Sequence, residues 1–577
     1  MENGCRYKMR HRRRPFEPAV AYATAAQTRA AGAATDWEGN RLLTGRALAS
    51  ATLIAVLGFA AACGGGASTS TPAAASGTAS TTAAATAPAA ASSSKTLTIA
   101  DSYGDPTGNW DPMETSLIAT AEVLPNVVQT LVTFDAKGQL QPVLATSWEF
   151  KDPKTVIFHL RQNVKFSNGE PFDANAVKYT FDRIIGTDGA KFPVHSSYSS
   201  VASVQVIDPS TVQFNLNRVD PLLVKKTSGY QSAIVPPQYI QSKGEQYYQT
   251  HPVGTGPYLM TDYKEGSSVT LQANPDYWGG APKIQKVVFQ FLPDPTSRVS
   301  AVEAGSVALA QMIPPSQADA IKSLSGYTLG VAKTFTVYFV RIDVAHAPLN
   351  TEIARQAVNY AINKQEIISK ILNGYGAMVN TVTVPTTFGY DPNIDPYPYD
   401  PAKAKQLMAQ AGIKPGTQLT FDYDGSNGQF AEVAQAMADY LNAVGFNVKL
   451  QPEDFQTLYT NLVPKSNAGN MYEFFWGGGG TLDFDGTAVS SYQKGQYWNP
   501  SYDNPQVDAL IKDEENTVDQ NKRLQDFYQI DQIVHQAALD IPLYQTDDLW
   551  AVSKQLQGFV PPADEQVRLE QLSWAGK

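Results

Sequence analysis

The sequence predicts an α/β protein that is built from more than one packed unit. A strand, a helix and a second strand follow one another between residues 417 and 450, which is the order of a parallel βαβ unit. The chain has 577 residues, more than a single hydrophobic core of ordinary domain size organises. Hydrophobic residues make up 43% of it, so most of the chain has the apolar content that folding requires.

The predicted βαβ unit has clear sequence boundaries. "TQLTFDYDG" (residues 417–425) and "FNVKL" (446–450) have the composition of strands. An amphipathic helix is predicted over residues 430–444, where Gly445 closes it. A preceding helix is predicted over residues 400–412, with an aspartate as its N-cap and a glycine at its end.

The loops that follow these strands are the candidate binding positions. Ligands of parallel sheets bind beyond the carboxyl ends of the strands. This rule selects the loop 422–428 and the glycines after the strand-like run "MYEFFW" (471–476). Glycines let backbone amides approach a bound molecule, and a tryptophan offers a flat face for packing. The alternative is a mobile surface loop with its tryptophan buried in the core. The candidate binding residues from these loops are Tyr423, Asn427, Trp476, Gly477, Gly478 and Gly479.

The first half of the chain has weaker but readable patterns. "KTLTIADSYGDPTGNWDP" (residues 95–112) is predicted to begin as a strand and to break into a loop. "TVIFHLRQNVKFSNGEPF" (155–172) alternates apolar and polar residues and predicts a β-hairpin. Asp173 is the predicted N-cap of the helix that follows.

The N-terminal region has the pattern of an export signal. A basic flank precedes an apolar run from residue 47 to residue 62, and Cys63 and several glycines follow it. "AAAC" (60–63) resembles the bacterial lipobox, in which the cysteine sulfur is acylated, although the usual leucine is replaced by Ala60. A transmembrane helix is the alternative, but it needs about 20 apolar residues and the run is shorter. We therefore expect residues 1–62 to be an N-terminal extension with a lipoprotein signal peptide, and Cys63 to be the lipidation site.

The charge distribution separates the N-terminal region from the rest. Residues 1–46 hold nine Lys or Arg and four Asp or Glu, whereas the chain from Cys63 onward holds 35 basic and 50 acidic residues. An acidic body argues against nucleic acid as a partner. The basic string "MRHRRRP" (9–15) can be interpreted as a nucleic-acid patch, but a mis-assigned start codon or an extended n-region that is removed is the favoured explanation. Residues 63–95 are almost entirely Gly, Ala, Ser, Thr and Pro, so we expect a disordered tether there.

Several strings, in order along the chain, resemble the family 5 extracellular solute-binding proteins. This group contains the oligopeptide-, dipeptide-, nickel-chelate- and cello-oligosaccharide-binding proteins of ABC importers. The strings are "LATSWEFKDPKTVIFHLRQNVKFSNGEPFDANAVKYTFDRI" (144–184), "GTGPY" (254–258), "NPDYWGGAPKI" (274–284), "IARQAVNYAINKQEI" (353–367), "YDPAKAKQLMAQAG" (399–412) and "NPSYDNPQVDALI" (499–511). The resemblance runs from about residue 96 to about residue 570.

The resemblance implies a periplasmic-binding-protein-like α/β fold of two lobes, with an extra subdomain inserted in the first lobe and a hinge between the lobes. The implied first lobe comprises residues 96–131, 252–332 and 541–577, the inserted subdomain residues 132–251, and the second lobe residues 333–540. The chain would cross between the lobes near 335–342 and again near 540–545.

The resemblance also implies a function. The protein would capture a peptide or peptide-like solute in the cleft between the lobes and deliver it to the permease subunits of an ABC importer. It would act as a monomer without cofactor or metal, on the outer face of the cell membrane, and touch the membrane only through its N-terminal lipid. Binding of an oligosaccharide or another non-peptide solute is the first alternative, and a surface sensor or adhesin that reuses the fold is the second.

One departure from the family bears on the ligand. In the peptide binders, an aspartate three residues after the tryptophan of a W-x-x-D string holds the α-ammonium group, and Gly479 stands at that place here. Asp483 and Asp485 follow shortly after and are candidate substitutes, while Tyr103 and Trp110 are candidate aromatic contacts. Without an anchor of this kind, free dipeptides are expected to bind weakly.

The sequence gives little support to an enzyme. The serine hydrolase string G-x-S-x-G is absent, and the six histidines have no metal-binding helical spacing. The glycine run lacks the Lys-Ser/Thr of a phosphate-binding loop. We therefore predict a binding protein with no catalytic residues.

Overall fold

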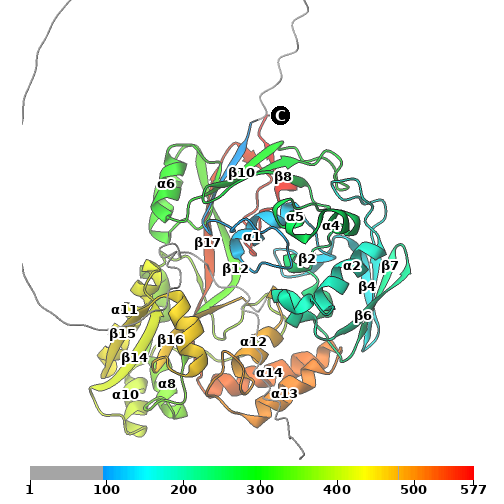
Figure 1. The fold of residues 1–577 in the computed structure, drawn as a ribbon. Coiled ribbons are helices and arrows are strands. Elements are labelled where there is room, and N and C mark those ends of the chain that lie inside the picture. The colour runs from blue at the N-terminus through cyan, green and yellow to red at the C-terminus, as the bar shows by residue number, and fades with distance from the viewer. Residues whose placement is uncertain (1–94, 478–479, 577) are drawn as a thin grey trace, which may run out of the picture. The chain divides into compact units, whose positions relative to one another are not determined.

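A continuous mixed sheet organises the described residues, 95–477 and 480–576, of the computed structural model (Figure 1). These residues belong to one unit of the chain, while Cys63, the apolar run and the tether lie outside the described residues. In spatial order the strands are β15 (Phe446–Glu453), β14 (Thr417–Asp424), β16 (Met471–Trp476), β12 (Tyr327–Ile342), β17 (Asp540–Ser553), β11 (Leu309–Ala310), β1 (Leu97–Asp101), β10 (Lys286–Phe291), β9 (Ser268–Ala273) and β8 (Tyr258–Lys264), with β13 (Ala377–Met378) paired to β17.

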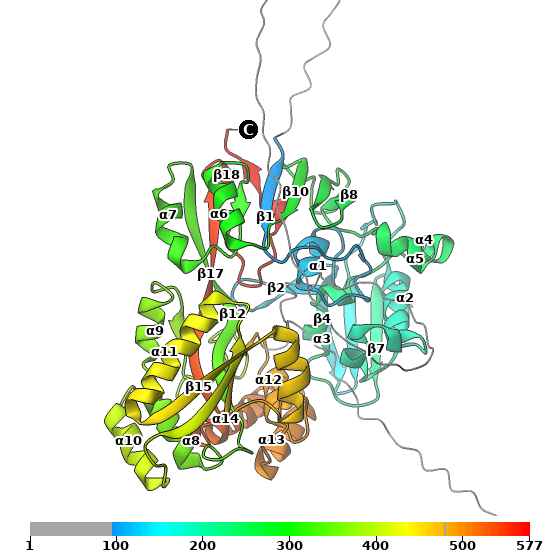
Figure 2. The same ribbon diagram turned by 60° about the vertical axis from the view of Figure 1, so that its left-hand side comes forward.

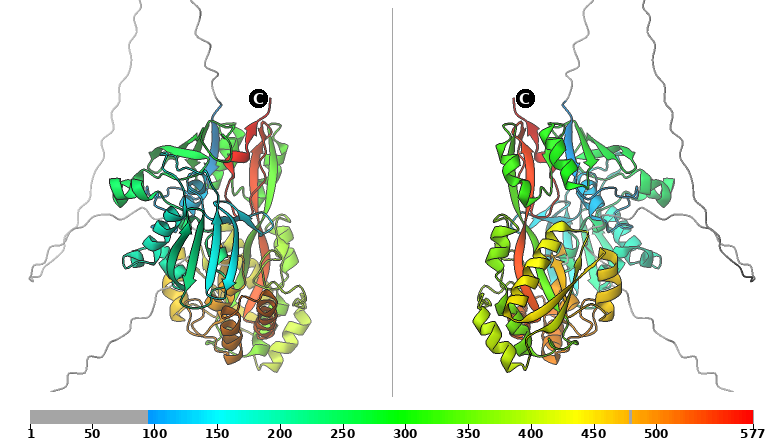
Figure 3. Two further views of the ribbon diagram at one scale, coloured as in Figure 1. Left: turned by 90° about the vertical axis from the view of Figure 1, so that its right-hand side faces the viewer. Right: turned by 90° about the vertical axis from the view of Figure 1, so that its left-hand side faces the viewer.

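The two long strands β12 and β17 pair antiparallel through the middle of this sheet. Their ladder runs from Tyr327 opposite Ser553 to Arg341 opposite Asp540. Figures 2 and 3 show β17, in red, extending from the helices α6 and α7 to the helices at the other end of the sheet. The register shifts between Lys333 and Val337, so the ladder is irregular at its centre.

On one side of β12, the strands β14, β15 and β16 form the parallel part of the sheet. Two separate apolar cores lie here, one around α8 and α11 and the other around α13 and α14. The helices of this side are α8 (Glu352–Ala361), α9 (Lys364–Lys370), α10 (Pro401–Gln410), α11 (Gly428–Val444), α12 (Asp485–Tyr492), α13 (Pro505–Glu515) and α14 (Gln520–Gln536).

On the other side of β17, the strand β1 pairs parallel with both β10 and β11. Two further apolar cores pack against this part of the sheet. Its helices and its small strand pair are α1 (Ile118–Val123), α6 (Pro295–Glu303), α7 (Ala318–Ser323), β18 (Leu556–Gln557) and β19 (Ser573–Trp574).

A second, antiparallel sheet of four strands stands apart from the large one and has its own core. Its order is β4 (Ala145–Asp152), β5 (Thr155–Leu160), β7 (Thr211–Leu216) and β6 (Val201–Asp208). The accompanying elements are α2 (Ala174–Ile185), α3 (Leu223–Lys226), α4 (Pro237–Lys243), α5 (Glu245–Thr250) and the pair β2 (Val132–Phe134) with β3 (Leu140–Pro142).

The local predictions for the βαβ unit are confirmed. β14 and β15 are parallel with α11 between them, and Gly445 ends the helix in the left-handed conformation with a φ of 119°. The Asp173 side chain accepts from the backbone N–H groups of Asn175 and Ala176, as an N-cap does.

The predicted hairpin over residues 155–172 is wrong. The alternation of Val156, Phe158 and Leu160 does bury one face of β5, but β5 pairs with β4 and β7. Residues 164–172 instead close a small turn of their own, with a single bridge between Lys165 and Pro171. The periodicity therefore identified the strand correctly, whereas its partners come from more distant segments.

Within the described residues, no helix is both long enough and apolar enough to cross a membrane.

Candidate functional site

A cavity of about 610 Å³ lies where strands from both halves of the large sheet end. The parallel strands β14 and β16 end at Asp424 and Trp476, and both residues line the cavity. From the other half, Tyr103 follows the end of β1 and Met312 follows the end of β11, and both line it as well. Because ligands of parallel sheets bind beyond the carboxyl ends of the strands, this cavity is the candidate functional site.

The two long central strands also contribute to the cavity wall. Thr334, Phe335 and Thr336 line it from the part of β12 where the register shifts. Opposite them, Thr546 of β17 lies 2.5 Å from the Thr334 hydroxyl, oxygen to oxygen. The irregular centre of the β12–β17 ladder is thus part of the site.

Aromatic rings form much of the cavity surface. The rings of Tyr338 and Tyr544 stack with centroids 5.2 Å apart, and Phe430 packs on Tyr338 at 4.9 Å. Such rings give a solute apolar faces and polar edges. Among the described residues, the aromatic side chains that line the cavity are Tyr103, Phe134, Tyr230, Phe335, Tyr338, Tyr375, Phe430, Phe475, Trp476 and Tyr544.

A buried glutamate holds two residues of the cavity wall, Tyr338 and Asp424, in place. Glu473 is fully buried on β16; its Oε2 accepts from the Tyr338 hydroxyl at 2.6 Å, and its Oε1 accepts from the backbone N–H of Asp424 at 2.6 Å. Burial raises the pKa of Glu473 to about 8. A side chain so enclosed fixes the cavity wall and does not face the solute.

The indole nitrogen of Trp476 is the clearest polar group left for a solute on this wall. Trp476 Nε1 is buried and has no hydrogen-bond partner within residues 95–477 and 480–576. An unsatisfied buried donor costs about 1–3 kcal/mol, so an acceptor on a bound solute would be stabilised here.

The cavity lining is also acidic. Among the described residues that line the cavity, five carry carboxyl groups and one carries a positive charge. The acidic residues are Asp424, Asp547, Asp548, Asp564 and Glu565, and the basic residue is Arg298. The Arg298 guanidinium donates to the backbone carbonyl oxygens of Gln311 and Met312 at 3.0 and 2.9 Å, and to two more on residues 292 and 293. Its donors are therefore directed at the protein.

Two of these lining residues, Asp548 and Glu565, form a group of four carboxyl groups with Asp101 and Glu122, which do not line the cavity. Burial raises the pKa of Asp101 to about 7 and the pKa values of Glu122 and Asp548 well above their ordinary range. The pKa of Glu565 is also raised, chiefly by burial. Tyr103 donates its hydroxyl hydrogen to Glu565 Oε2. We call these four residues the Asp548 cluster.

Four of the binding residues predicted from sequence line the cavity. They are Tyr103, Asn427, Trp476 and Gly477. The Asn427 side-chain oxygen accepts from the backbone N–H groups of Gln429 and Phe430, so it caps α11 at the cavity wall. Gly478 and Gly479 lie outside the described residues.

Two of the predicted aromatic residues do not line the cavity. Trp110 is 1% exposed and packs edge-on against Tyr263, at 5.7 Å between centroids. Tyr423 alternates with Asp424 along β14, so its side chain lies on the other face of the strand, near Phe421. Both residues belong to the packing of the fold.

Asp483 and Asp485 lie in a buried ion network and do not line the cavity. Arg523 donates to both Asp483 oxygens, at 2.8 and 3.0 Å, and Lys225 lies 2.6 Å from Oδ2. Burial raises the pKa of Glu514 to about 11, and the charge of Asp485 adds to this rise, although Glu514 also accepts from Arg523 at 2.9 Å. We call these five residues the Asp483 cluster. Its carboxyl groups already have partners, so it offers no free ammonium anchor.

The sequence reasoning missed the acidic wall. Asp547 and Asp548 stand side by side within the otherwise largely apolar strand β17, and Glu565 follows a Pro-Pro-Ala loop. Two adjacent acids in a buried strand are the signal that would have singled them out, because charged residues are rarely buried without a reason.

Three cavity residues other than glycine have left-handed backbone conformations. Their φ angles are 48° at Met312, 48° at Leu482 and 65° at Glu565. Such conformations cost about 1–3 kcal/mol for residues with a side chain, and they concentrate at functional sites.

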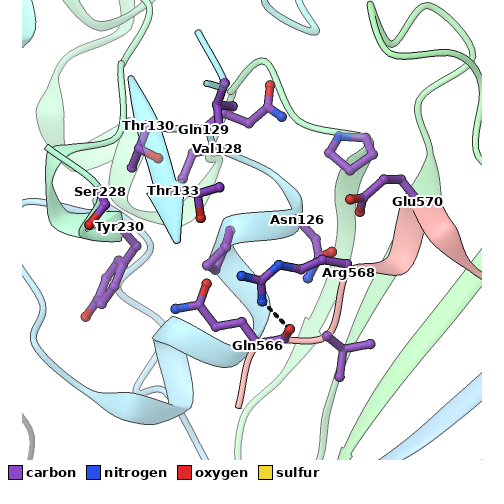
Figure 4. A pocket seen from close by; sticks show the side chains of 14 residues that line it. Asn126, Val128, Gln129, Thr130, Thr133, Ser228, Tyr230, Gln566, Arg568 and Glu570 are labelled. Atoms are coloured by element: carbon purple, nitrogen blue, oxygen red, sulfur yellow. Dashed lines mark hydrogen bonds between the residues drawn. The ribbon is translucent and has the colours of Figure 1, made fainter. Parts of the chain in front are cut away.

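A smaller pocket of about 120 Å³ adjoins the cavity, with which it shares Thr133, Ser228, Tyr230 and Gln566. Figure 4 shows polar side chains around it, among them Gln129, Asn126 and Glu570. The smaller pocket is therefore an extension of the main cavity.

Comparisons with known proteins agree with this arrangement. Residues 139–500 match the family described as bacterial extracellular solute-binding proteins, family 5. Di/tripeptide-binding protein 1 of Pseudomonas aeruginosa is 27% identical over 479 residues, which cover 77% of this chain and 87% of the relative. Glutathione-binding protein GsiB of Salmonella paratyphi A is 27% identical over 461 residues, which cover 78% and 89% of the two chains. The solved structure of the ABC transporter substrate-binding protein CtaP from Listeria monocytogenes superposes with a TM-score of 0.76 at 23% identity, covering 83% of this chain and 99% of that one.

The fold and the cavity define a solute-binding protein with the two-lobed α/β architecture of periplasmic binding proteins. The chain belongs to family 5 of the bacterial extracellular solute-binding proteins. As a member of this family it is a binding protein rather than an enzyme, and the two relatives described above are likewise named as binding proteins.

Proposed function

We propose that the protein captures a small peptide or peptide-like solute in the 610 Å³ cavity and delivers it to the permease of an ABC importer. The observation that carries the proposal is the cavity itself, built at the carboxyl ends of parallel strands from both halves of the large sheet. Its volume lies within the range of about 300–1,000 Å³ that is usual for small-molecule sites.

Relatives support a peptide over other solutes. The two relatives described above are named for di/tripeptide and glutathione binding, and both align over most of their length. The cavity also suits the mixed character of a short peptide, because one wall is largely aromatic and the other carries several carboxyl groups. Aromatic rings would also stack on a sugar, so an oligosaccharide is the alternative that the experiment below must separate.

The proposed lobes are those that the family resemblance implies. The first lobe would comprise residues 96–131, 252–332 and 541–577, and the second residues 333–540, with the subdomain 132–251 inserted in the first. The register shift in β12 next to the cavity is a natural place for the hinge, because an irregular ladder bends more easily than a regular one. The two lobes would close on the solute from either side of the cavity.

The proposed cellular arrangement rests on the N-terminal sequence. Cys63 would be the first residue of the mature protein and would carry the lipid, and residues 63–95 would tether a monomeric body to the outer face of the cell membrane. In the variant Cys63→Ala, the body should be released to the medium or remain as an uncleaved precursor. A variant that is still cleaved at this site and stays on the membrane would contradict lipid anchoring.

Native mass spectrometry of the purified protein tests the ligand class directly. A bound molecule in the mass range of two to four amino acids, identified as a peptide by fragmentation, would support the proposal. A bound sugar would replace it with the oligosaccharide alternative. If the protein is empty, calorimetric titration with a set of di-, tri- and tetrapeptides should give saturable binding, and cello-oligosaccharides at equal concentration should give none.

A further inference from the structure

The acidic wall of the cavity, which we define as Asp547, Asp548 and Glu565, is less well neutralised than the other carboxyl groups there. Asp564 forms an ion pair with Arg568, with Oδ1 and Nη1 2.8 Å apart. Asp424 accepts from the backbone N–H of Ser426 at 2.9 Å. Within the acidic wall, burial raises the pKa of Asp547 and Lys333, opposite it in the β12–β17 ladder, opposes this rise. Asp548 and Glu565 form no ion pair among the described residues, and the donors of Arg298 are taken up by backbone carbonyls.

Asp548 is the residue that points most directly to a ligand. It is 8% exposed and lines the cavity. Its Oδ1 accepts from the Met312 backbone N–H at 3.2 Å, whereas Oδ2 has no hydrogen-bond partner of ordinary geometry within residues 95–477 and 480–576. The Trp550 indole lies close enough to lower the pKa of Asp548, but burial outweighs it. A carboxylate this buried is costly unless a positive group reaches it.

Glu565 presents a second carboxyl group from a separate segment of the chain. The Tyr103 hydroxyl donates to its Oε2, which orients the side chain, and a left-handed backbone holds the residue at the cavity wall. Asp547 lies beside Asp548 on β17 and has a buried Oδ1 without a hydrogen-bond partner in the described part of the chain. Asp548 and Glu565, from two separate segments, therefore lie close to each other at the cavity, while Asp547 lies on the other face of β17, opposite Lys333 in the ladder.

We propose that the acidic wall binds a cationic group of the solute, an ammonium or a guanidinium, with Asp548 as its main partner and Glu565 as the second. This inference rests on the proposed function, because it concerns the same cavity. It would supply the negative charge that the peptide binders of the family place where this sequence has Gly479.

An organic cation fits the wall better than a metal ion. Within the described residues, no group of three or more His, Cys, Asp or Glu side chains is arranged to hold a metal. The cavity also has many aromatic faces, which attract organic cations and pack against their carbon atoms.

The test uses peptides that differ in one charge. Acetyl-trialanine amide has no charge, trialanine amide has one ammonium, and acetyl-Ala-Arg-Ala amide has one guanidinium. Agmatine serves as a cationic probe that is not a peptide. Dissociation constants are measured by calorimetry at neutral pH for the wild-type protein and for Asp548→Asn, Glu565→Gln and Asp319→Asn. The last variant removes the same charge from an exposed position on α7, and Asn at position 548 keeps the acceptor for the Met312 N–H.

We expect at least one cationic peptide to bind about tenfold or more tightly than the uncharged one, as charge-assisted hydrogen bonds in a desolvated site imply. This advantage should fall to about twofold or less in Asp548→Asn and decrease in Glu565→Gln, while Asp319→Asn keeps it. If Asp548→Asn does not fold, the proposal is judged by Glu565→Gln alone, which should reduce the affinity advantage of the cationic peptide.

Other outcomes separate the two proposals. If the uncharged peptide binds as tightly as the cationic peptides, the peptide function stands and the cation site is wrong. If agmatine binds in an Asp548-dependent way and no peptide does, the cation site stands and the peptide function is wrong. If no cationic probe binds, or if the variants leave cation binding unchanged, the cation site is overturned.

Discussion

The two buried acidic clusters of this protein differ in their counter-charges. The Asp483 cluster has three carboxyl groups together with Arg523 and Lys225, and burial raises the pKa of its third carboxyl group, on Glu514. The Asp548 cluster has four carboxyl groups, and the two cations near it, Arg298 and Arg568, are engaged elsewhere, Arg298 by backbone carbonyls and Arg568 by Asp564. The first cluster is neutralised within the protein, which makes it a structural support. The second cluster has no ion pair of this kind, and raised pKa values rather than counter-charges limit its negative charge. In our proposal, the cationic group of a solute supplies the counter-charge.

This difference shows why residue type alone is a poor guide to a binding site. Asp483 and Asp485 follow the Trp476 strand in sequence and were the natural candidates, yet they are engaged by a helix forty residues further on. Asp548 stands beside Asp547 in a largely apolar strand, but the sequence does not show which of the two lacks a partner. A buried carboxyl group becomes informative only when its partners are known, because a paired acid and an unpaired acid look the same in a sequence.

The largest expected effect is a loss of folding stability when the ion pairs of the Asp483 cluster are broken. Arg523→Met leaves Asp483 buried without its main partner, so it should lower the free energy of unfolding by about 3–5 kcal/mol. Arg568→Met is the matched control, because Arg568 also pairs with an aspartate, but in a partly exposed site with side chains 28% and 25% exposed. The control should cost about 1 kcal/mol or less.

Urea denaturation of both variants provides the measurement. Adding Asp483→Asn to Arg523→Met should restore part of the loss, because it removes the charge that was left buried. Equal losses for the two arginine variants would mean that the Asp483 cluster is no more important than a surface ion pair.

The next largest effect is a dependence of folding stability on pH, which comes from the Asp548 cluster. Because the pKa of Asp101 is raised to about 7, the folded chain keeps a proton there that the unfolded chain loses near its ordinary value of 3.8. Stability should therefore fall as the pH rises from about 4 to about 7. Glu122, Asp548 and Glu565 add to this fall, and the positive charge of Arg298 opposes it.

Urea denaturation at pH 5, 6 and 7 checks the sign. Asp101→Asn should make the slope shallower by roughly 1 kcal/mol per pH unit, the value for one proton. Asp135→Asn is the control, since backbone hydrogen bonds, that from Gln139 first, lower the pKa of Asp135 and its titration lies below this window. An unchanged slope in Asp101→Asn would show that the cluster does not hold extra protons.

A smaller effect distinguishes the aromatic wall from ordinary core. Trp476→Ala should weaken solute binding by about 1–3 kcal/mol through lost apolar contact. Trp498→Ala is the matched control, because Trp498 packs on the same Phe474 ring, at 5.2 Å against 5.9 Å for Trp476, but does not line the cavity. The control should reduce stability and leave affinity nearly unchanged. Both are checked by calorimetric titration and thermal melting, and the reverse pattern would place Trp476 in the core.

Sequence reasoning succeeded where the signal is local. The strands around α11 and the caps at Asp173 and Gly445 follow from residues close to one another in the chain, so their positions could be predicted. The strand-end rule then brought Asn427 and Trp476 to the cavity wall. These features need no knowledge of distant partners.

The features that the sequence did not predict have no local signal. The partners of β5, the ion pair between Asp483 and Arg523, and the meeting of Asp548 with Glu565 at one wall all depend on contacts between distant segments. A single sequence has no periodic signal for such contacts. Trp110 illustrates the remaining ambiguity, because an aromatic residue in a polar loop next to the predicted strand fits a binding role and a core role equally well.

The smallest expected effect is on the second cation of the Asp483 cluster. Lys225 on α3 lies 2.6 Å from Asp483 Oδ2 and 4.8 Å from the centre of the Phe388 ring, and its side chain is 18% exposed. Because Asp483 keeps both hydrogen bonds from Arg523, Lys225→Met should lower the free energy of unfolding by only about 0.5–1 kcal/mol. Urea denaturation at low salt and at about 1 M salt measures this, and the difference from wild type should shrink at high salt as exposed charges are screened. A loss as large as that of Arg523→Met would show that Asp483 needs both cations to remain buried, and that Arg523 alone does not neutralise it.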